Sequence, residues 1–199
     1  MSVADDITLP ENCAIVVGIP TSARSFSQAK LQTDRTFGAQ FLGGWEQYQS
    51  QWIRHFVPFK ETVQAWGVAV SEEVDLLHFG ATFQRPGIHV VILFSHWSDD
   101  EVEFSDGFAK VEAIIAQIPR SFCGIVDLCV CHPRLLANEL VVHRPNCLVR
   151  YSPRKSKPTY WLFYFMAVFA VLRNGRSNYP EAMRDVTSGL LEWASNVKE

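Results

Sequence analysis

The chain has 199 residues, of which 48% are apolar and 20% charged, and its formal net charge is −3. A chain of this size and composition can bury a full core, so global disorder is excluded and a single domain over residues 1–199 is predicted. With 18 basic against 21 acidic side chains, no basic field is available to neutralise phosphates, and direct nucleic-acid binding is not expected.

The number of cysteines and the N-terminal sequence indicate the cellular compartment in which the protein is expected. Five cysteines form an odd number with no regular framework, which favours a reducing compartment over a disulfide scaffold and predicts at least one free thiol. The first ten residues are acidic and carry no apolar run, so no targeting segment is expected. These features favour a cytoplasmic protein.

Strand-like and helical segments alternate along the chain, which is typical of a parallel sheet covered by helices. Residues 13–20 are apolar and β-branched and are the first predicted strand. Residues 21–33 are polar and are predicted to form an exposed loop. Aromatic residues then recur at steps of three and four over residues 34–56, which predicts a helix that Gly43 and Gly44 weaken.

The central segments supply the clearest strand. Residues 63–70 are the second strand candidate, and Ser71 is predicted to cap a helix that runs to Phe83 and has two acids in its first turn. Residues 88–97 form a near-continuous apolar run that ends in a histidine. Such a run is typical of a strand buried on both faces.

The second half of the chain continues this alternation. The remaining predicted elements are a small β-excursion at 98–107, a helix at 108–118, strands at 124–131 and 146–151, an aromatic helix at 160–172, and a last helix opened by Ser177 and Pro180. The aromatic segment imitates a membrane span, but as a helix it covers only about 20 Å. The hydrocarbon core of a bilayer is roughly 30 Å thick, so a buried helix and no membrane partner are predicted.

Two reactive side chains end two of these strands. His96 lies at the carboxyl end of the strand 88–97, and Cys131 lies at the carboxyl end of the strand 124–131. In open α/β sheets the working crevice lies outside the carboxyl ends of the strands, and neighbouring strands are only about 4.8 Å apart. An imidazole can deprotonate a nearby thiol or protonate a leaving amine, so this pair is suited to covalent catalysis.

These segments resemble the histidine and cysteine motifs of caspase-fold (clan CD) cysteine peptidases. Residues 90–107 (VVILFSHWSDDEVEFSDG) and 124–133 (GIVDLCVCHP) are most similar to the CHAT branch, which also contains separase-like enzymes. In that branch the histidine strand ends in a small residue plus His-Gly, a short hairpin finishing Asp-Gly follows, and the cysteine strand ends in Ala-Cys. Residues 173–186 (RNGRSNYPEAMRDV) resemble the Gly-rich turn and Ala-containing helix with which these domains close.

The resemblance covers residues 13–186 and implies both a fold and catalytic roles. The implied fold is a three-layer sandwich, a mostly parallel central sheet of about six strands with helices on both faces. His96 would be the acid-base, Cys131 the nucleophile, and the backbone N–H groups of Cys131 and Trp97 the oxyanion hole. Trp97 stands where the family usually has Gly, which permits backbone angles that Trp does not.

The identity of the nucleophile and of the substrate-binding residues has alternatives. The run Asp127-Leu128-Cys129 resembles the Asp-x-Cys pattern of metacaspase relatives, which would make Cys129 the nucleophile and place Asp127 in the primary specificity pocket. The Cys131-His132 dipeptide and the CHAT register favour Cys131. Arg24, just beyond the first strand, would select an acidic substrate side chain, whereas Asp127 would select a basic one; the sequence does not choose between them.

The resemblance implies a cofactor-free cysteine endopeptidase acting on a protein or peptide substrate. Peptidases of this kind are commonly silent until a partner or ligand reorders the site, and CHAT domains usually accompany repeat or sensor modules. A separate regulatory or sensor protein is therefore expected, as in an antiviral defence or cell-death system. The alternatives are an inactive caspase-fold interaction module, suggested by Trp97, and a zinc-binding domain that uses Cys129, Cys131, His132, His143 and Cys147, whose spacing lacks paired C-x2-C knuckles.

Overall fold

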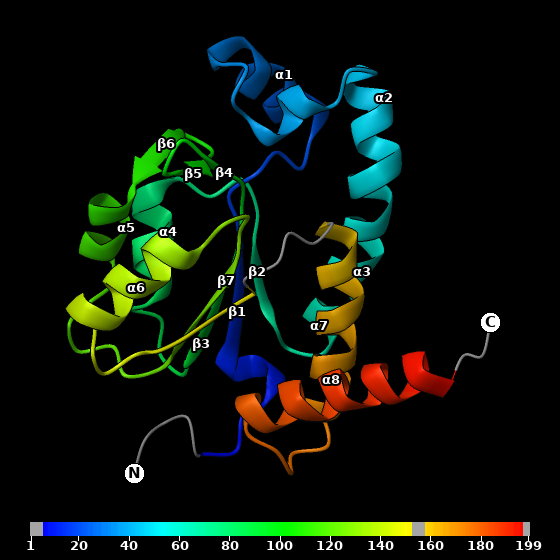
Figure 1. The fold of residues 1–199 in the computed structure, drawn as a ribbon, viewed down its shortest axis with the longest axis vertical. Helices are drawn as coiled ribbons and strands as arrows, with labels where there is room; N and C mark the ends of the chain where they lie inside the picture. The colour runs from blue at the N-terminus through cyan, green and yellow to red at the C-terminus, as the bar shows by residue number, and fades with distance from the viewer. Residues whose placement is uncertain (1–5, 153–157, 197–199) are drawn as a thin grey trace.

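A computed structural model, which describes residues 6–152 and 158–196, shows an α/β fold around a five-stranded parallel sheet (Figure 1). The strand order is β2-β1-β3-β7-β8. The strands are β1 (Cys13–Val17), β2 (Ala69–Ser71), β3 (Val90–Phe94), β7 (Ile125–Cys129) and β8 (Leu148–Tyr151). The prediction of about six strands counted residues 98–107, which instead belong to a separate small sheet.

Helices cover both faces of the sheet. Figure 1 shows α4 (Leu76–Thr82), α5 (Val111–Gln117) and α6 (Arg134–His143) on one side and α3 (Arg54–Ala65), α7 (Pro158–Leu172) and α8 (Tyr179–Asn196) on the other. Alternate residues of each strand face opposite sides of the sheet, so Ile15 packs into the core cluster on the α3/α7 side and Val16 into the cluster on the α4/α5 side. All five positions of β1, β3 and β7 are buried, which explains the continuous apolar sequences of β1 and β3 and the single acid, Asp127, in β7.

The aromatic segment forms the buried helix α7, as predicted. Phe165, Val168 and Phe169 are fully buried in the core cluster between the sheet and the helices α3 and α7. Within residues 6–152 and 158–196, no helix combines the length and apolar character needed to cross a bilayer.

The predicted β-excursion is a three-stranded antiparallel sheet. Its strands are β4 (Trp97–Ser98), β5 (Glu101–Phe104) and β6 (Gly107–Lys110). Residues 108–110 were predicted to open a helix, but they pair with residues 101–103. Helix α5 therefore begins only at Val111.

The segment after β1 departs from the prediction. Residues 21–33 contain helix α1 (Ala23–Gln32) instead of a loop. Ser22 and Ser25 form a capping box at its start, and Phe26 is its one buried anchor. Because only one apolar side chain is needed to hold this helix, its sequence shows almost no apolar periodicity.

The single helix predicted over residues 34–56 is broken into shorter pieces. These are the 3-10 helix η3 (Phe37–Gln40), α2 (Gly44–Tyr48) and the π-helical η4 (Gln49–Ile53), which runs on into α3. Gly44 has φ +69°, a left-handed conformation that separates η3 from α2.

Other boundaries also differ from the predictions. The strands predicted over residues 13–20, 88–97 and 124–131 are shorter in the structure, at Cys13–Val17, Val90–Phe94 and Ile125–Cys129. Helix α3 continues to Ala65, so residues 63–65 are not part of a strand. Ser71 pairs in β2, and Asp75 caps α4 by accepting a hydrogen bond from the backbone N–H of His78. Helix α6 was not predicted. A short 3-10 helix, η2 (Pro10–Asn12), leads into β1.

Candidate active site

The register of β3 and β7 brings the ends of the histidine and cysteine segments together. Phe94, the last residue of β3, pairs with Cys129, the last residue of β7. The ladder continues one step, because the N–H of Ser95 donates to the carbonyl of Cys129 at 3.4 Å. His96 and Cys131 follow at the same distance along the chain, and both line one cavity of about 50 Å³.

His96 is held under the 3-10 helix η3. Its side chain is buried, its Nε2 lies 3.0 Å from the amide nitrogen of Gln40, and its ring lies 5.8 Å from the ring of Phe37. This contact fixes the orientation of the ring, and which of the two groups donates depends on the tautomer of His96. Helix η3 therefore both orients and covers the imidazole.

Cys131 lies in a tight turn from strand to helix. β7 ends at Cys129, and α6 begins at Arg134. His132 between them has φ 51°, which is uncommon outside glycine. Such a turn presents the half-buried Cys131 at the sheet edge beside the N-terminus of α6, where the helix dipole favours a negative charge.

Cys129 lines the same cavity in a different environment. It is buried in the core cluster on the α3/α7 side, whereas Cys131 packs partly against the opposite cluster. A strand that ran on through residue 131 would place Cys129 and Cys131 on one face, but β7 ends at Cys129. Burial, and next the Asp127 carboxylate, raise the pKa of the Cys129 thiol well above its usual value.

Trp97 neither fills the cavity nor needs a glycine backbone. Its side chain is buried in the core cluster on the α4/α5 side and is not among the residues that line the cavity. Its φ lies outside the left-handed region. The ring therefore does not occlude the space between His96 and Cys131.

Asp127 and Arg24 are not brought to this cavity. Asp127 is fully buried in the middle of β7, where Nη1 of Arg150 lies 2.7 Å from both of its oxygens and the hydroxyl of Tyr179 donates to it at 2.7 Å. Burial raises the pKa of the Asp127 carboxyl, and the Arg150 guanidinium acts in the opposite direction. Arg24 is exposed on α1 and lines no part of the cavity.

Several residues at the site were missed by sequence reasoning. Phe37 and Gln40 lay within the single helix predicted over residues 34–56, whereas in the structure they belong to η3, which packs over His96. Glu103 lies behind the histidine: its N–H donates to the carbonyl of His96 at 2.8 Å, and its Oε2 accepts from the N–H of Phe37 at 2.7 Å. In the sequence, the only indication of a special role for Glu103 was its position between two apolar residues of the predicted hairpin.

The side chains named for zinc do not gather. In the part of the chain that the structure describes, no three His, Cys, Asp or Glu groups are arranged to hold a metal ion. His143 pairs with Glu139 at 3.3 Å, and the thiol of Cys147 donates to the carbonyl of Phe122 at 3.2 Å. None of the five cysteines, all of which lie in the described part of the chain, forms a disulfide.

No protein-family model matches the chain, and a search of curated proteins returns no significant match. The chemistry that the cavity supports is therefore inferred from its own groups. These are the imidazole of His96 and the thiols of Cys129 and Cys131, at the ends of two neighbouring strands, with apolar walls from Ile19, Phe94 and Trp161.

Proposed function

We propose that the protein is a caspase-fold cysteine endopeptidase of the CHAT type in which Cys131 is the nucleophile and His96 the acid-base. The observation that carries this proposal is the register of β3 and β7, since it leads His96 and Cys131 into one cavity at the carboxyl edge of the sheet. The antiparallel hairpin directly after His96 also supports it, because the resemblance implied a short hairpin at this place.

The proposed reaction is acyl transfer through a thioester. The imidazole of His96 takes the proton of the Cys131 thiol, and the sulfur adds to the scissile carbonyl carbon. His96 then gives its proton to the departing amine as the C–N bond breaks, which leaves an acyl group on Cys131. Water, deprotonated by His96, hydrolyses the thioester. Backbone N–H groups of Cys131 and Trp97 would hold the oxyanion.

Cys131 fits the nucleophile better than Cys129 does. A thiol attacks as its thiolate, and burial together with Asp127 keeps the Cys129 thiol protonated at neutral pH. Cys131 is half-buried and adjoins the N-terminus of α6. The strained turn at His132 is a further feature typical of a residue presented for reaction.

The small size of the cavity supports control by a partner or ligand. A space of about 50 Å³ is far below the roughly 300 Å³ of the smallest usual ligand sites. Phe37 and Gln40 of η3 cover His96. We infer that a separate regulatory or sensor protein moves η3, in a cytoplasmic defence or cell-death system such as the resemblance implies.

Cleavage of a diverse peptide library tests the activity. Wild-type protein is compared with Cys131→Ala, and Cys123→Ala serves as a matched control because Cys123 is an exposed thiol outside the cavity. We expect Cys131→Ala to abolish cleavage and Cys123→Ala to leave it unchanged. Cleavage that survives in Cys131→Ala contradicts the assignment.

A second pair of variants tests the covering helix. Gln40→Ala removes the partner of His96 Nε2, and Gln47→Ala changes a nearby glutamine whose side chain bonds Gly43 instead. Basal cleavage is expected to rise in Gln40→Ala and not in Gln47→Ala. If neither these variants nor the wild type cleaves any peptide, the inactive interaction module, which the covered His96 also suits, becomes the better assignment.

A further inference from the structure

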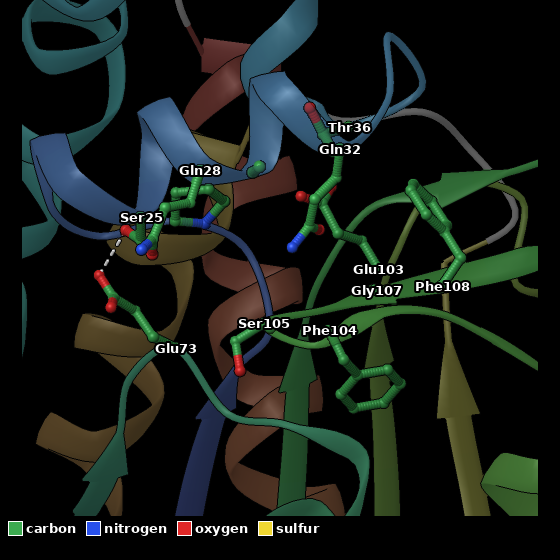
Figure 2. Close-up of a pocket in the computed structure, with 13 residues that line it drawn as sticks. Ser25, Gln28, Gln32, Thr36, Glu73, Glu103, Phe104, Ser105, Gly107 and Phe108 are labelled. Atoms are coloured by element: carbon green, nitrogen blue, oxygen red, sulfur yellow. Dashed lines mark hydrogen bonds between the residues drawn. The ribbon is translucent and has the colours of Figure 1, made fainter.

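A second, larger cavity lies on the other side of the segment that carries His96. Its volume is about 260 Å³, and it shares no lining residue with the cavity of Cys131. Figure 2 shows α1 above it, with Gln28 and Gln32 pointing down, Glu73 at one end and Glu103 reaching up from β5. Two carboxylates and several neutral polar groups therefore face one space.

The position of this cavity is one where α/β proteins bind ligands. Within the sheet, β2 lies next to one edge of β1 and β3 lies next to the other edge, so the strand order reverses at β1. Ligands of open α/β sheets bind outside the carboxyl ends of the strands at such a switch point. Gly18 follows β1 here, and a Cβ on it would lie 2.5 Å from the carbonyl oxygen of Glu103, so the floor of the cavity requires glycine.

Glu103 is the feature that points to a ligand. Glu103 is only 2% exposed, yet it forms no ion pair among the described residues. Oε2 accepts from the N–H of Phe37, and Oε1 has no hydrogen-bond partner in the described part of the chain. Arg35, two residues before Phe37, pairs with Asp99 and Glu101 instead.

Glu73 supplies a second carboxylate to the cavity, and several hydrogen bonds hold this carboxylate in place. Its Oε1 accepts from the hydroxyls of Ser25 and Thr21 at 2.6 and 3.0 Å and from the N–H of Thr21 at 3.2 Å. These hydrogen bonds lower its pKa, although partial burial acts against them. Glu73 has φ 51°, a left-handed conformation that a non-glycine residue keeps only when its surroundings hold it.

We propose that this cavity binds a small organic cation, an alkyl ammonium or alkyl guanidinium, whose charged head pairs with Glu103 and whose stem lies toward Gln28 and Glu73. A buried carboxylate without a cation is costly, and a cationic donor that fills the free side of Oε1 removes that cost. The volume is just below the roughly 300 to 1,000 Å³ of ordinary small-molecule sites, which suits a ligand of amino-acid size.

The proposed cation site is separate from the cavity of Cys131, but the two sites are connected through Glu103. Glu103 contacts the backbone of His96 and of Phe37, so an occupant of the cavity would bear on the helix η3 that covers His96. The cation site does not require that the protein cleave peptides, and its test is a binding measurement.

Calorimetric titration with n-butylguanidinium and n-butylurea at pH 8 tests the proposal. The two probes have the same shape and differ in charge. We expect wild-type protein to bind n-butylguanidinium and to bind n-butylurea at least tenfold more weakly. Because both probes are applied to the wild-type chain, this comparison does not depend on the folding of any variant. Equal binding of the two probes, or no binding of n-butylguanidinium, overturns the proposal.

Two variants locate the site. Glu103→Gln replaces the unpaired carboxylate by a neutral group of the same size, and Glu61→Gln removes one negative charge from an exposed position on α3. We expect at least a tenfold loss of affinity for n-butylguanidinium in Glu103→Gln and none in Glu61→Gln. Wild-type affinity in a folded Glu103→Gln protein also overturns the proposal.

Discussion

Glu103 is a buried acid whose ionisation the fold disturbs. Burial raises the pKa of its carboxyl to about 7, and the hydrogen bond from the backbone N–H of Phe37 only partly offsets this effect. It also joins β5 to η3 and to the carbonyl of His96. A single buried acid thus connects the hairpin, the covering helix and the backbone of the candidate acid-base.

The shifted pKa of Glu103 predicts how stability changes with pH. The unfolded chain loses this proton near the ordinary value of 4.5, whereas the folded chain keeps it to about 7. Stability from this group is therefore complete below pH 4.5 and is lost as the pH rises to about 7, by about 3 kcal/mol.

Urea unfolding between pH 5 and pH 8 measures this effect. The wild type is expected to lose stability over that interval, and Glu103→Gln is expected to lose about 2 to 3 kcal/mol less, since a pKa shift of one unit corresponds to about 1.4 kcal/mol. The exposed-acid variant Glu61→Gln should follow the wild type. Parallel curves for wild type and Glu103→Gln would show that Glu103 ionises normally in the folded protein.

At the level of elements, the sheet was largely predictable and the segment from α1 to α4 was not. The strands β1, β3 and β7 are buried on both faces, so largely apolar runs revealed them. Helix α1 has only one buried apolar residue, Phe26, and begins at a cap formed by Ser22. A search for apolar periodicity therefore does not detect this helix. The helix α4 was expected, but a serine with two following acids was a misleading capping signal.

The candidate site was predictable in part for the same reason. His96 and Cys131 follow the two clearest strands, and parallel strands deliver their carboxyl ends to one edge of the sheet. Phe37, Gln40 and Glu103 reach the site through the packing of η3 and the hairpin on that edge. Such tertiary contacts have no signature in the local sequence.

The cap of α4 offers a direct test of the revised helix boundary. Asp75 accepts from the N–H of His78 at 2.7 Å, and Ser71 is a strand residue with no capping role. Asp75→Ala is expected to lower the free energy of unfolding by about 1 kcal/mol, as the loss of an N-cap usually does. Ser71→Ala should change it by less than about 0.5 kcal/mol. Urea unfolding of both variants checks this, and a larger loss in Ser71→Ala would restore the first boundary.

Across the whole molecule, a buried charge network joins the sheet to the helices on one face. Asp127 of β7 pairs with Arg150 of β8 and accepts from the hydroxyl of Tyr179 in α8. The guanidinium of Arg150 also lies over the Trp161 and Tyr164 rings of α7, 5.4 and 5.5 Å from their centroids. From these contacts we expect Asp127 to have a structural role rather than to contact a substrate.

Variants of Asp127 separate these two roles. Asp127→Ala leaves Arg150 without its buried partner and is expected to cost about 3 to 5 kcal/mol of stability. Tyr179→Phe removes one hydrogen bond and should cost about 1 kcal/mol. Asp185→Ala, an exposed acid on α8, is the matched control and should have little effect. An Asp127→Ala protein that keeps its stability but cleaves a different set of peptides would instead make Asp127 a specificity residue.

The central claim is that His96 activates Cys131. Iodoacetamide is small and needs no peptide subsite, so its rate of reaction with each thiol, followed by mass spectrometry, tests that claim most directly. Cys123, an exposed thiol outside the cavity, is the internal reference. We expect Cys131 to react faster than Cys123 and much faster than Cys129. His96→Ala should slow the reaction of Cys131 by at least about tenfold, a threshold set below the roughly 100- to 10,000-fold that a positioned base contributes to catalysis, and should leave Cys123 unchanged. A rate at Cys131 that is the same in wild type and His96→Ala, or preferential labelling of Cys129, would contradict the account.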